Sequence, residues 1–380
     1  MKSVILEDLL KDGFSEKFAK YYLNIRESEI NNPIYDKELV NWAYANGFTA
    51  ESVAALGINE QNKQEYYTDY EYYKLWPLNN WTRIWINDKL TLKYTLSKSG
   101  LDKYMPKYYY YMSPNGLRAL MDNENKGNTM DDFIKELKDV KVFASKPCNG
   151  TGSAGFFRLS YENNIFYING EACSEQEIIN FVLAHPNYVF TEYLTPCKEL
   201  KRWSDMIHTF RIVVTNETGN SPTVAGAYIR IPHEGSGAAN YVFHDGTNNE
   251  KYNLYANYNV ATGEYGNGII VYPDRLIKTE THPDNGETMS GVLSFHKELK
   301  QAVYEISHWY NNVEYFGFDL CVTDDGVKLM EINTHPGIII LQHYLPIRKN
   351  KSLLSFFNHK MKEIDSLNEE KRKLRNAIPR

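Results

Sequence analysis

The 380-residue sequence predicts an α+β fold, with a helical N-terminal region followed by a body of strands and helices. Helical patterns fill residues from about 1 to 80, strand patterns begin near residue 140, and an amphipathic helix from about 291 to 309 precedes a last hairpin. A chain of this length exceeds the size at which one hydrophobic core stops growing. We therefore expect two or three lobes that share one active site.

The composition narrows the class of protein. A formal net charge of -6 argues against a general nucleic-acid binder, which normally carries a basic balance or stripe. The widely spaced cysteines favour structural thiols over a zinc site or a disulfide framework. The N-terminus meets Glu7 and Asp8 too soon for a signal peptide, and no apolar run approaches the length needed to span a membrane. We expect a cytoplasmic protein without a transmembrane segment.

The first part of the chain predicts short helices. Lys37 to Asn46 and Ala50 to Leu56 have helical patterns, separated by Gly47-Phe48-Thr49 as a turn and N-cap. The tyrosine-rich stretches Tyr66 to Tyr73 and Tyr108 to Tyr111 would fit stacking on a sugar or a base. Such residues more often pack half-buried surfaces, which is the interpretation we prefer.

The remaining elements follow from alternation and turn signals. A capping box of Ser174 and Glu177 predicts the start of a helix, and Asn163-Asn164 predicts a hairpin turn. The charged stretch from Asn368 to Arg380 predicts a solvated helix and tail. The predicted strands are Lys141 to Lys146, Gly155 to Tyr161, Ile165 to Ile168, Tyr188 to Leu194, Phe210 to Thr215 and Thr223 to Ile231.

A glycine-rich loop offers an anion-binding site. Gly150 to Gly155 matches G-x-G-x-x-G, but Phe156 to Tyr161 alternates like a strand, whereas a Rossmann loop opens a helix. A Walker loop would place the lysine after its last glycine, and here Lys146 precedes the loop. A strand-loop-strand of small residues can still close over a triphosphate through its backbone N–H groups; an ordinary hairpin loop is the alternative. The predicted nucleotide contacts are Lys146, Gly150, Thr151, Gly152, Ser153 and Gly155.

The segment from Phe318 to Asn333 predicts an acidic hairpin. If Asp324-Asp325-Gly326 is the turn, Thr323 faces Val327, and the same register places Asp319 opposite Glu331. A bulge would change this register.

Two opposed carboxylates need a compensating partner. Asp319 and Glu331 would lie roughly 5 Å apart, which is destabilising without a cation or a shared proton. Asn333 follows Glu331 by two residues and so shares its face. Two carboxylates and an amide oxygen suit magnesium, so we predict Asp319, Glu331 and Asn333 as metal ligands. A surface hairpin with solvated acids is the alternative.

The order of these parts resembles the ATP-grasp superfamily. Lys146 before a glycine loop, with Asp319, Glu331 and Asn333 far downstream, carries the resemblance, which covers residues from about 85 to 345. It implies two α+β lobes that hold ATP between them. The expected divisions are a helical N-terminal region (1–85), an N-terminal lobe with the glycine loop (86–194), a C-terminal lobe with the metal site (195–350), and a C-terminal helix and tail (351–380).

The resemblance implies further ATP contacts. Asn87-Asp88-Lys89-Leu90 is similar to the family's Asp-Lys pair, which makes Lys89 a second ATP-contacting lysine. Thr191-Glu192-Tyr193-Leu194 resembles the hinge strand whose backbone reads adenine, so Glu192, Tyr193 and Leu194 are expected at the nucleotide.

The resemblance also implies residues for chemistry. His208 to Val214 looks like the strand that carries an arginine, here Arg211, toward the γ-phosphate in ribosomal-protein glutamate ligases and tubulin tyrosine ligases. Those families often place an acid before this arginine, where this chain has Phe210. Arg230, followed by Asn240, resembles the substrate-side pair of the same branch, and its planar donor fork suits an acyl phosphate. His335 lies near the metal motif and is a candidate substrate contact, as an alternative to a packed histidine.

The implied activity is an ATP-dependent ligase that forms an amide through an acyl phosphate, with magnesium as the metal and manganese as a substitute. The expected substrates are a small-molecule or glycan-linked carboxylate and an amine such as an amino acid, with no nucleic acid. The N-terminal region looks like that of bacterial ATP-grasp proteins associated with sugar transfer and surface-polysaccharide loci. A phosphotransferase acting on a hydroxyl and a non-catalytic ATP-binding partner in glycan assembly are the alternatives.

Overall fold

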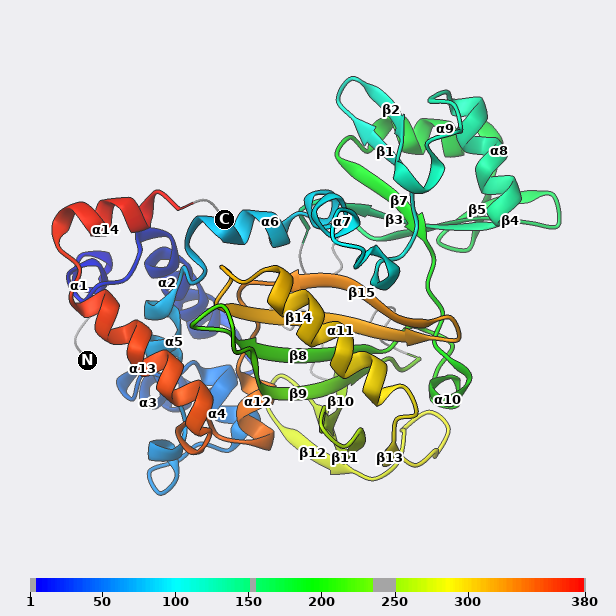
Figure 1. The fold of residues 1–380 in the computed structure, drawn as a ribbon. Coiled ribbons are helices and arrows are strands. Elements are labelled where there is room, and N and C mark those ends of the chain that lie inside the picture. Colours follow the sequence, from blue (N-terminus) through cyan, green and yellow to red (C-terminus); the bar gives the residue numbers. More distant parts are fainter. Residues whose placement is uncertain (1–4, 151–154, 235–250, 379–380) are drawn as a thin grey trace.

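The computed structural model describes residues 5–150, 155–234 and 251–378 (Figure 1). Helices form the N-terminal region, as the sequence predicted. Thr49 begins α4 as an N-cap, where its side chain accepts a hydrogen bond from the backbone N–H of Ser52. The helices up to the first strand are α1 (Leu6–Lys11), α2 (Glu16–Asn31), α3 (Lys37–Ala45), α4 (Ala50–Leu56), α5 (Asp69–Leu75), α6 (Ile84–Asn87) and α7 (Lys89–Ser97).

An antiparallel sheet of seven strands forms the first lobe, in the order β2-β1-β7-β3-β4-β5-β6. Helices α8 (Met130–Val140) and α9 (Glu175–Ala184) pack on it through a shared apolar core. The hairpin at Asn163-Asn164 and the capping box of Ser174 and Glu177 are confirmed. The strands are β1 (Tyr108–Ser113), β2 (Gly116–Ala119), β3 (Val142–Pro147), β4 (Phe157–Glu162), β5 (Ile165–Ile168), β6 (Glu171–Cys173) and β7 (Tyr188–Glu192).

A second antiparallel sheet of eight strands forms the larger lobe, in the order β12-β11-β10-β9-β8-β14-β15 with β13 paired to β11. Helix α10 (Lys198–Lys201) lies on the connection between the two sheets (Figure 1). The strands are β8 (Thr209–Thr215), β9 (Thr223–Ile231), β10 (Asn253–Tyr258), β11 (Glu264–Val271), β12 (Leu276–Thr279), β13 (Gly291–Val292), β14 (Tyr315–Thr323) and β15 (Gly326–Asn333).

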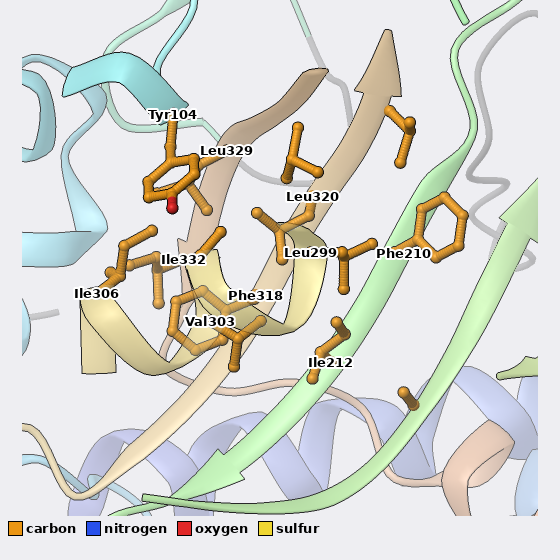
Figure 2. Close-up of a cluster of buried hydrophobic side chains, with 14 of the residues drawn as sticks. Tyr104, Phe210, Ile212, Leu299, Val303, Ile306, Phe318, Leu320, Leu329 and Ile332 are labelled. Carbon is orange, nitrogen blue, oxygen red and sulfur yellow. The ribbon is translucent and has the colours of Figure 1, made fainter. Parts of the chain in front are cut away.

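Helix α11 (His296–Trp309) covers one face of this second sheet (Figure 2). The sequence predicted that it would begin at about Gly291, and this start is wrong. Gly291 and Val292 pair with β11 instead, so the chain enters the helix only at His296. The apolar residues from Leu299 to Ile306 point from α11 into the core shared with β8, β14 and β15.

The opposite face of the second sheet packs against the N-terminal region and the C-terminal helices α12 (Ile339–Tyr344) and α13 (Lys351–Asp365). Helix α14 (Glu369–Asn376) follows them and contacts the N-terminal region. Trp76 and Tyr315 share this second core with aromatic residues of α13. The first and last helices, α1 and α14, lie side by side (Figure 1). As predicted, α14 contains no fully buried residue, but Arg375 anchors it by donating hydrogen bonds to the carbonyl oxygens of Gly13, Lys74 and Trp76.

The cysteines and tyrosines behave as packing residues. Cys148, Cys197 and Cys321 are buried, Cys173 is partly buried, and all four thiols are free. Tyr108, Tyr109 and Tyr110 are buried within β1. None of the helices in the described ranges combines the length and the apolar character that crossing a membrane requires.

Candidate active site

Alternation along two neighbouring strands, β8 and β14, separates the core from the site. Phe210 and Ile212 of β8, and Phe318 and Leu320 of β14, point toward α11 (Figure 2). Successive side chains of a strand face opposite sides of the sheet, so the residues between them face away from α11. Arg211 and Asp319 therefore meet on the opposite face, as neighbours in the β8–β14 ladder.

A bulge aims Glu331 at the same face. Asp324 and Asp325 form a two-residue turn, so Thr323 pairs with Gly326, and the predicted pairing of Thr323 with Val327 is wrong. An uninterrupted ladder would then place Met330 opposite Asp319. The register shifts between Asp319 and Leu320, and Asp319 pairs with Glu331 as predicted.

Protein cations and an amide compensate the two opposed carboxylates. Arg211 donates from Nε and Nη2 to the two oxygens of Asp319, over 2.5 and 2.9 Å, and Arg230 Nη1 lies 3.5 Å from Asp319 Oδ2. Asn333 Nδ2 donates to both acids, over 2.9 Å to Asp319 and 3.0 Å to Glu331. Burial opposes the charge of Asp319, but Arg211 and Arg230 outweigh burial and hold the pKa of Asp319 below its usual value. Asp319 is therefore a buried, ionised carboxylate.

Lys89, at the start of α7, contacts one acid of this pair. Asp88 caps α7 by accepting a hydrogen bond from the Thr91 N–H, which fixes Lys89 at the first helical position. Lys89 Nζ lies 3.4 Å from Glu331 Oε2 and donates to the Gly150 carbonyl oxygen over 3.2 Å. Lys89 thus joins the start of α7, the end of the glycine loop described by the structure, and the acidic hairpin.

Lys146 lies near the end of β3, where its backbone pairs with Val189 of β7, and its ammonium makes no hydrogen bond or ion pair to any described residue. Desolvation by the surrounding protein, followed by the positive charge of Lys89, lowers the pKa of Lys146 to about 8. Glu331 acts in the opposite direction. A desolvated ammonium without a partner is a site where an anion would be stabilised.

The predicted hinge residues follow β7. Glu192 ends this strand, and its carboxylate accepts a hydrogen bond from the Lys107 N–H over 3.0 Å. Tyr193 is partly exposed, with the Arg158 guanidinium 5.6 Å from its ring centroid. Leu194 is also partly exposed in the same connection. These three residues lie where the chain passes from the first sheet to the second.

Comparison with known proteins decides the family. The model of the sugar-transfer associated ATP-grasp family matches residues 65–354. The chain belongs to this family. The predicted α+β ATP-grasp fold with a helical N-terminal region is thereby confirmed. No curated protein matches the sequence.

Solved structures with similar folds include three bacterial ligases. A D-alanine–D-alanine ligase from Bacillus anthracis is 14% identical with a TM-score of 0.37, covering 77% of this chain and 70% of its own. D-alanyl-alanine synthetase A from Vibrio cholerae is 14% identical with a TM-score of 0.44, covering 76% and 67%. An L-amino acid ligase from Bacillus licheniformis is 15% identical with a TM-score of 0.37, covering 79% and 52%. These values are too low to transfer a function.

Some predicted site residues lie outside the described part of this ATP-grasp chain: Thr151, Gly152, Ser153 and Asn240. Gly150 is described, and its carbonyl oxygen contacts Lys89. Gly155 is described with φ of 76°, in the left-handed region that favours glycine, and a Cβ there would meet the Tyr188 hydroxyl at 2.4 Å. The position therefore requires glycine for a structural reason, independently of any contact with phosphate.

His335, which follows β15, packs against two aromatic rings of the N-terminal region. Its ring lies 4.9 Å from the ring of Phe18 and 3.9 Å from that of Trp76, measured between centroids. Burial, with a smaller effect from Arg83, lowers the pKa of His335 to about 3. Nδ1 lies 2.9 Å from the Thr334 hydroxyl, whereas Nε2 is buried without a hydrogen-bond partner.

Sequence reasoning did not identify Arg83 as a site residue. Its side chain is 1% exposed, and Nε and Nη1 are buried without a partner. The only feature of the sequence that could have indicated this residue is a single cation among the large apolar side chains between Trp81 and Trp85. Such a pattern predicts a buried arginine only when the segment is known to pack against another element.

The donor set fits a magnesium ion if one side chain turns. Asp319 and Glu331 supply carboxylate oxygens, but Asn333 presents its amide nitrogen to both. A half-turn of this amide would direct its oxygen at the same position and create the all-oxygen site that magnesium prefers. The described residues hold no cluster of three His, Cys, Asp or Glu side chains, so the amide is needed as the third ligand.

Proposed function

We propose that this ATP-grasp protein is an ATP-dependent ligase that joins a carboxylate to an amine. One observation carries the proposal: four cations, Lys89, Lys146, Arg211 and Arg230, converge with only two carboxylates at the junction of the lobes. This arrangement leaves a net positive charge, which suits a bound triphosphate. The family description supports ATP as the nucleotide.

The residues would bind and orient the reactants. Asp319, Glu331 and a turned Asn333 would hold magnesium, which supplies charge neutralisation at the phosphates when bound. Lys146 and Lys89 would donate to phosphate oxygens from the first lobe. Glu192, Tyr193 and Leu194 would line the adenine side from the connection between the sheets.

The two arginines differ in their availability. Arg211 is fixed by two hydrogen bonds to Asp319 and so positions that carboxylate. Arg230 makes a longer contact of 3.5 Å to the same acid and is free to stabilise negative charge on the substrate. We therefore assign Arg230, rather than Arg211, to the developing acyl phosphate.

In the proposed reaction, a carboxylate oxygen attacks the γ-phosphorus of ATP, and the bond to ADP breaks. The resulting acyl phosphate is attacked at carbon by an amine, which loses a proton as inorganic phosphate leaves and an amide forms. Positioning and electrostatics supply the catalysis, so no nucleophilic side chain is required. The sugar-transfer association of the family supports a glycan-linked carboxylate, and we propose a cytoplasmic setting.

The test is release of ADP and phosphate with pools of amino acids and sugar acids. We expect release that requires both a carboxylate and an amine, with a matching amide detected by mass spectrometry. ADP release with a hydroxyl acceptor and no amine would instead indicate a phosphotransferase. ATP binding without any turnover would indicate a non-catalytic role.

The matched variant for this test is Glu331→Gln, which keeps the shape of the side chain and removes its charge. We expect it to abolish turnover while its melting temperature stays close to that of the wild type, because Glu331 lies on the partly exposed face of β15. Wild-type turnover in Glu331→Gln would contradict the metal assignment.

A further inference from the structure

Arg83 is a buried cation whose position is fixed but whose charge is not compensated. It ends a short 3-10 helix, Asn80–Arg83, that leads into α6. Nε and Nη1 are buried without a partner, and no hydrogen bond, ion pair or ring contact engages the guanidinium among the described residues. By contrast, the buried Arg211 is fully paired with Asp319.

The backbone around Arg83 is anchored on the second sheet. Asn79 donates from Nδ2 to the Tyr315 carbonyl oxygen over 2.6 Å and accepts from the backbone N–H groups of Glu314 and Tyr315. The Thr82 hydroxyl donates to the Asn312 carbonyl oxygen over 3.1 Å. These contacts hold Arg83 in place relative to β14, so its side chain cannot simply swing into solvent with its loop.

Arg83 lies beside the end of β15 that carries the proposed metal ligands. At the far end of α6, the Asn87 side chain accepts a hydrogen bond from the Thr334 hydroxyl over 3.0 Å, and α6 packs on β15. His335 directly follows Thr334, the residue that contacts α6, and its Nε2 is also buried without a hydrogen-bond partner. Two unsatisfied nitrogen-bearing side chains thus occur together next to the site.

Burying an unpaired guanidinium is costly, since removing a charge from water costs several kcal/mol unless a partner replaces the water. A ligand can supply the missing hydrogen-bond acceptors and the opposite charge. The planar donor fork of a guanidinium suits carboxylate or phosphate oxygens. The ATP phosphates are already assigned to Lys89 and Lys146 on the first lobe. The unpaired donors therefore favour a different anion.

We propose that Arg83, with His335 beside it, binds an anionic oxygen group, a carboxylate or a phosphate, on the acceptor substrate. This inference rests on the proposed ligase function. It gives the helical N-terminal region a role in substrate selection, because Arg83 belongs to that region while the ATP contacts belong to the two lobes.

The experiment measures the melting temperature of the full chain in increasing inorganic phosphate or acetate, against chloride at equal ionic strength. An anion that binds the folded state raises the melting temperature in a concentration-dependent way. We expect such a rise in the wild type and a smaller one in Arg83→Met, in which only the nucleotide site can still bind the anion. The rise in Arg83→Lys should lie between the two. The anion that gives the Arg83-dependent rise identifies a phosphate-bearing or a carboxylate-bearing acceptor.

Arg118→Met is the matched control, since it removes an exposed guanidinium of β2 outside both proposed sites and should keep the anion response. Phosphate also stabilises proteins through exclusion from their surface, but this effect is shared by all variants. Equal responses in wild type and Arg83→Met, or no response of the wild type to either anion, would overturn the inference. So would a response reduced in Arg118→Met and kept in Arg83→Met.

The melting temperature without added anions distinguishes a ligand-binding role of Arg83 from a structural one. Removing an unpaired buried charge should leave the melting temperature of Arg83→Met without anions equal to or above that of the wild type. If Arg83→Met does not fold while Arg83→Lys keeps the full wild-type response, Arg83 is structural and the inference fails.

Calorimetry with ATP distinguishes the anion-site proposal from the ligase proposal, because Arg83→Met should bind ATP like the wild type. Absence of ATP binding in the wild type would contradict the ligase function itself.

Discussion

The affinity for ATP should fall as the pH rises above 8, because of Lys146. Its pKa of about 8 lies below the ordinary value of 10.5, since the surrounding protein desolvates the ammonium and Lys89 repels it. A bound triphosphate would stabilise the charged form and raise this pKa again. The lysine must then take up a proton when ATP binds at high pH, which weakens binding.

The magnitude follows from the two pKa values. If ATP restores the pKa of Lys146 to 10.5 or above, affinity falls about tenfold between pH 7 and pH 9. The full difference between 10.5 and about 8 corresponds to about 3 kcal/mol of binding free energy at about 1.4 kcal/mol per pKa unit. Because of the same lowered pKa, the unfolded chain binds more protons than the folded chain between about pH 8 and pH 10.5. Stability without ATP should therefore rise with pH in this window, opposite to the affinity.

Isothermal titration calorimetry of ATP binding between pH 7 and pH 10 tests this prediction. Lys146→Arg is the matched control, because a guanidinium stays charged throughout this range. The pH dependence should be present in the wild type and absent in Lys146→Arg. A flat wild-type profile, or an equal slope in both proteins, would refute the reasoning.

Three substitutions test other parts of the site. Lys146→Ala should weaken ATP binding by roughly 1.5–3 kcal/mol through loss of a charge-assisted contact, and unchanged affinity in calorimetry would count against the nucleotide assignment. Arg211→Ala should destabilise the fold by about 3–5 kcal/mol in denaturant unfolding, because Asp319 loses its main partner while buried; a smaller loss would mean that Arg230 replaces it. Gly317→Ala should lower the free energy of unfolding by about 1–3 kcal/mol in the same assay, since its Cβ would lie 2.6 Å from Pro336 Cβ. Wild-type stability would show that the chain around Pro336 can shift.

Local patterns in the sequence predicted much of the fold. The capping box of Ser174 and Glu177, the Asn163-Asn164 turn and the strand alternation depend on residues close together in the chain, and the structure confirms them. The predicted pairing of Asp319 with Glu331 is also found, but it depends on a bulge and not on the predicted pairing of Thr323 with Val327. The roles of these residues in binding metal and ATP stay predictions.

Contacts between distant segments decided the rest. The sequence alone did not place the bulge at Asp319. The possible registers of this hairpin contain the same residues, and they differ only in which side chains point into the core against α11. Arg211 was predicted to face the γ-phosphate, and only the adjacency of β8 and β14 showed that it pairs with Asp319.

The sequence by itself determined the type of most elements, because capping and alternation act over a few residues. Only the tertiary structure decided which charges meet. It joined Lys89 to Glu331, anchored α14 through Arg375, and buried Arg83 beside the end of β15. The physical reason is that burial and pairing of a charge depend on elements packed from elsewhere in the chain, which no local pattern specifies.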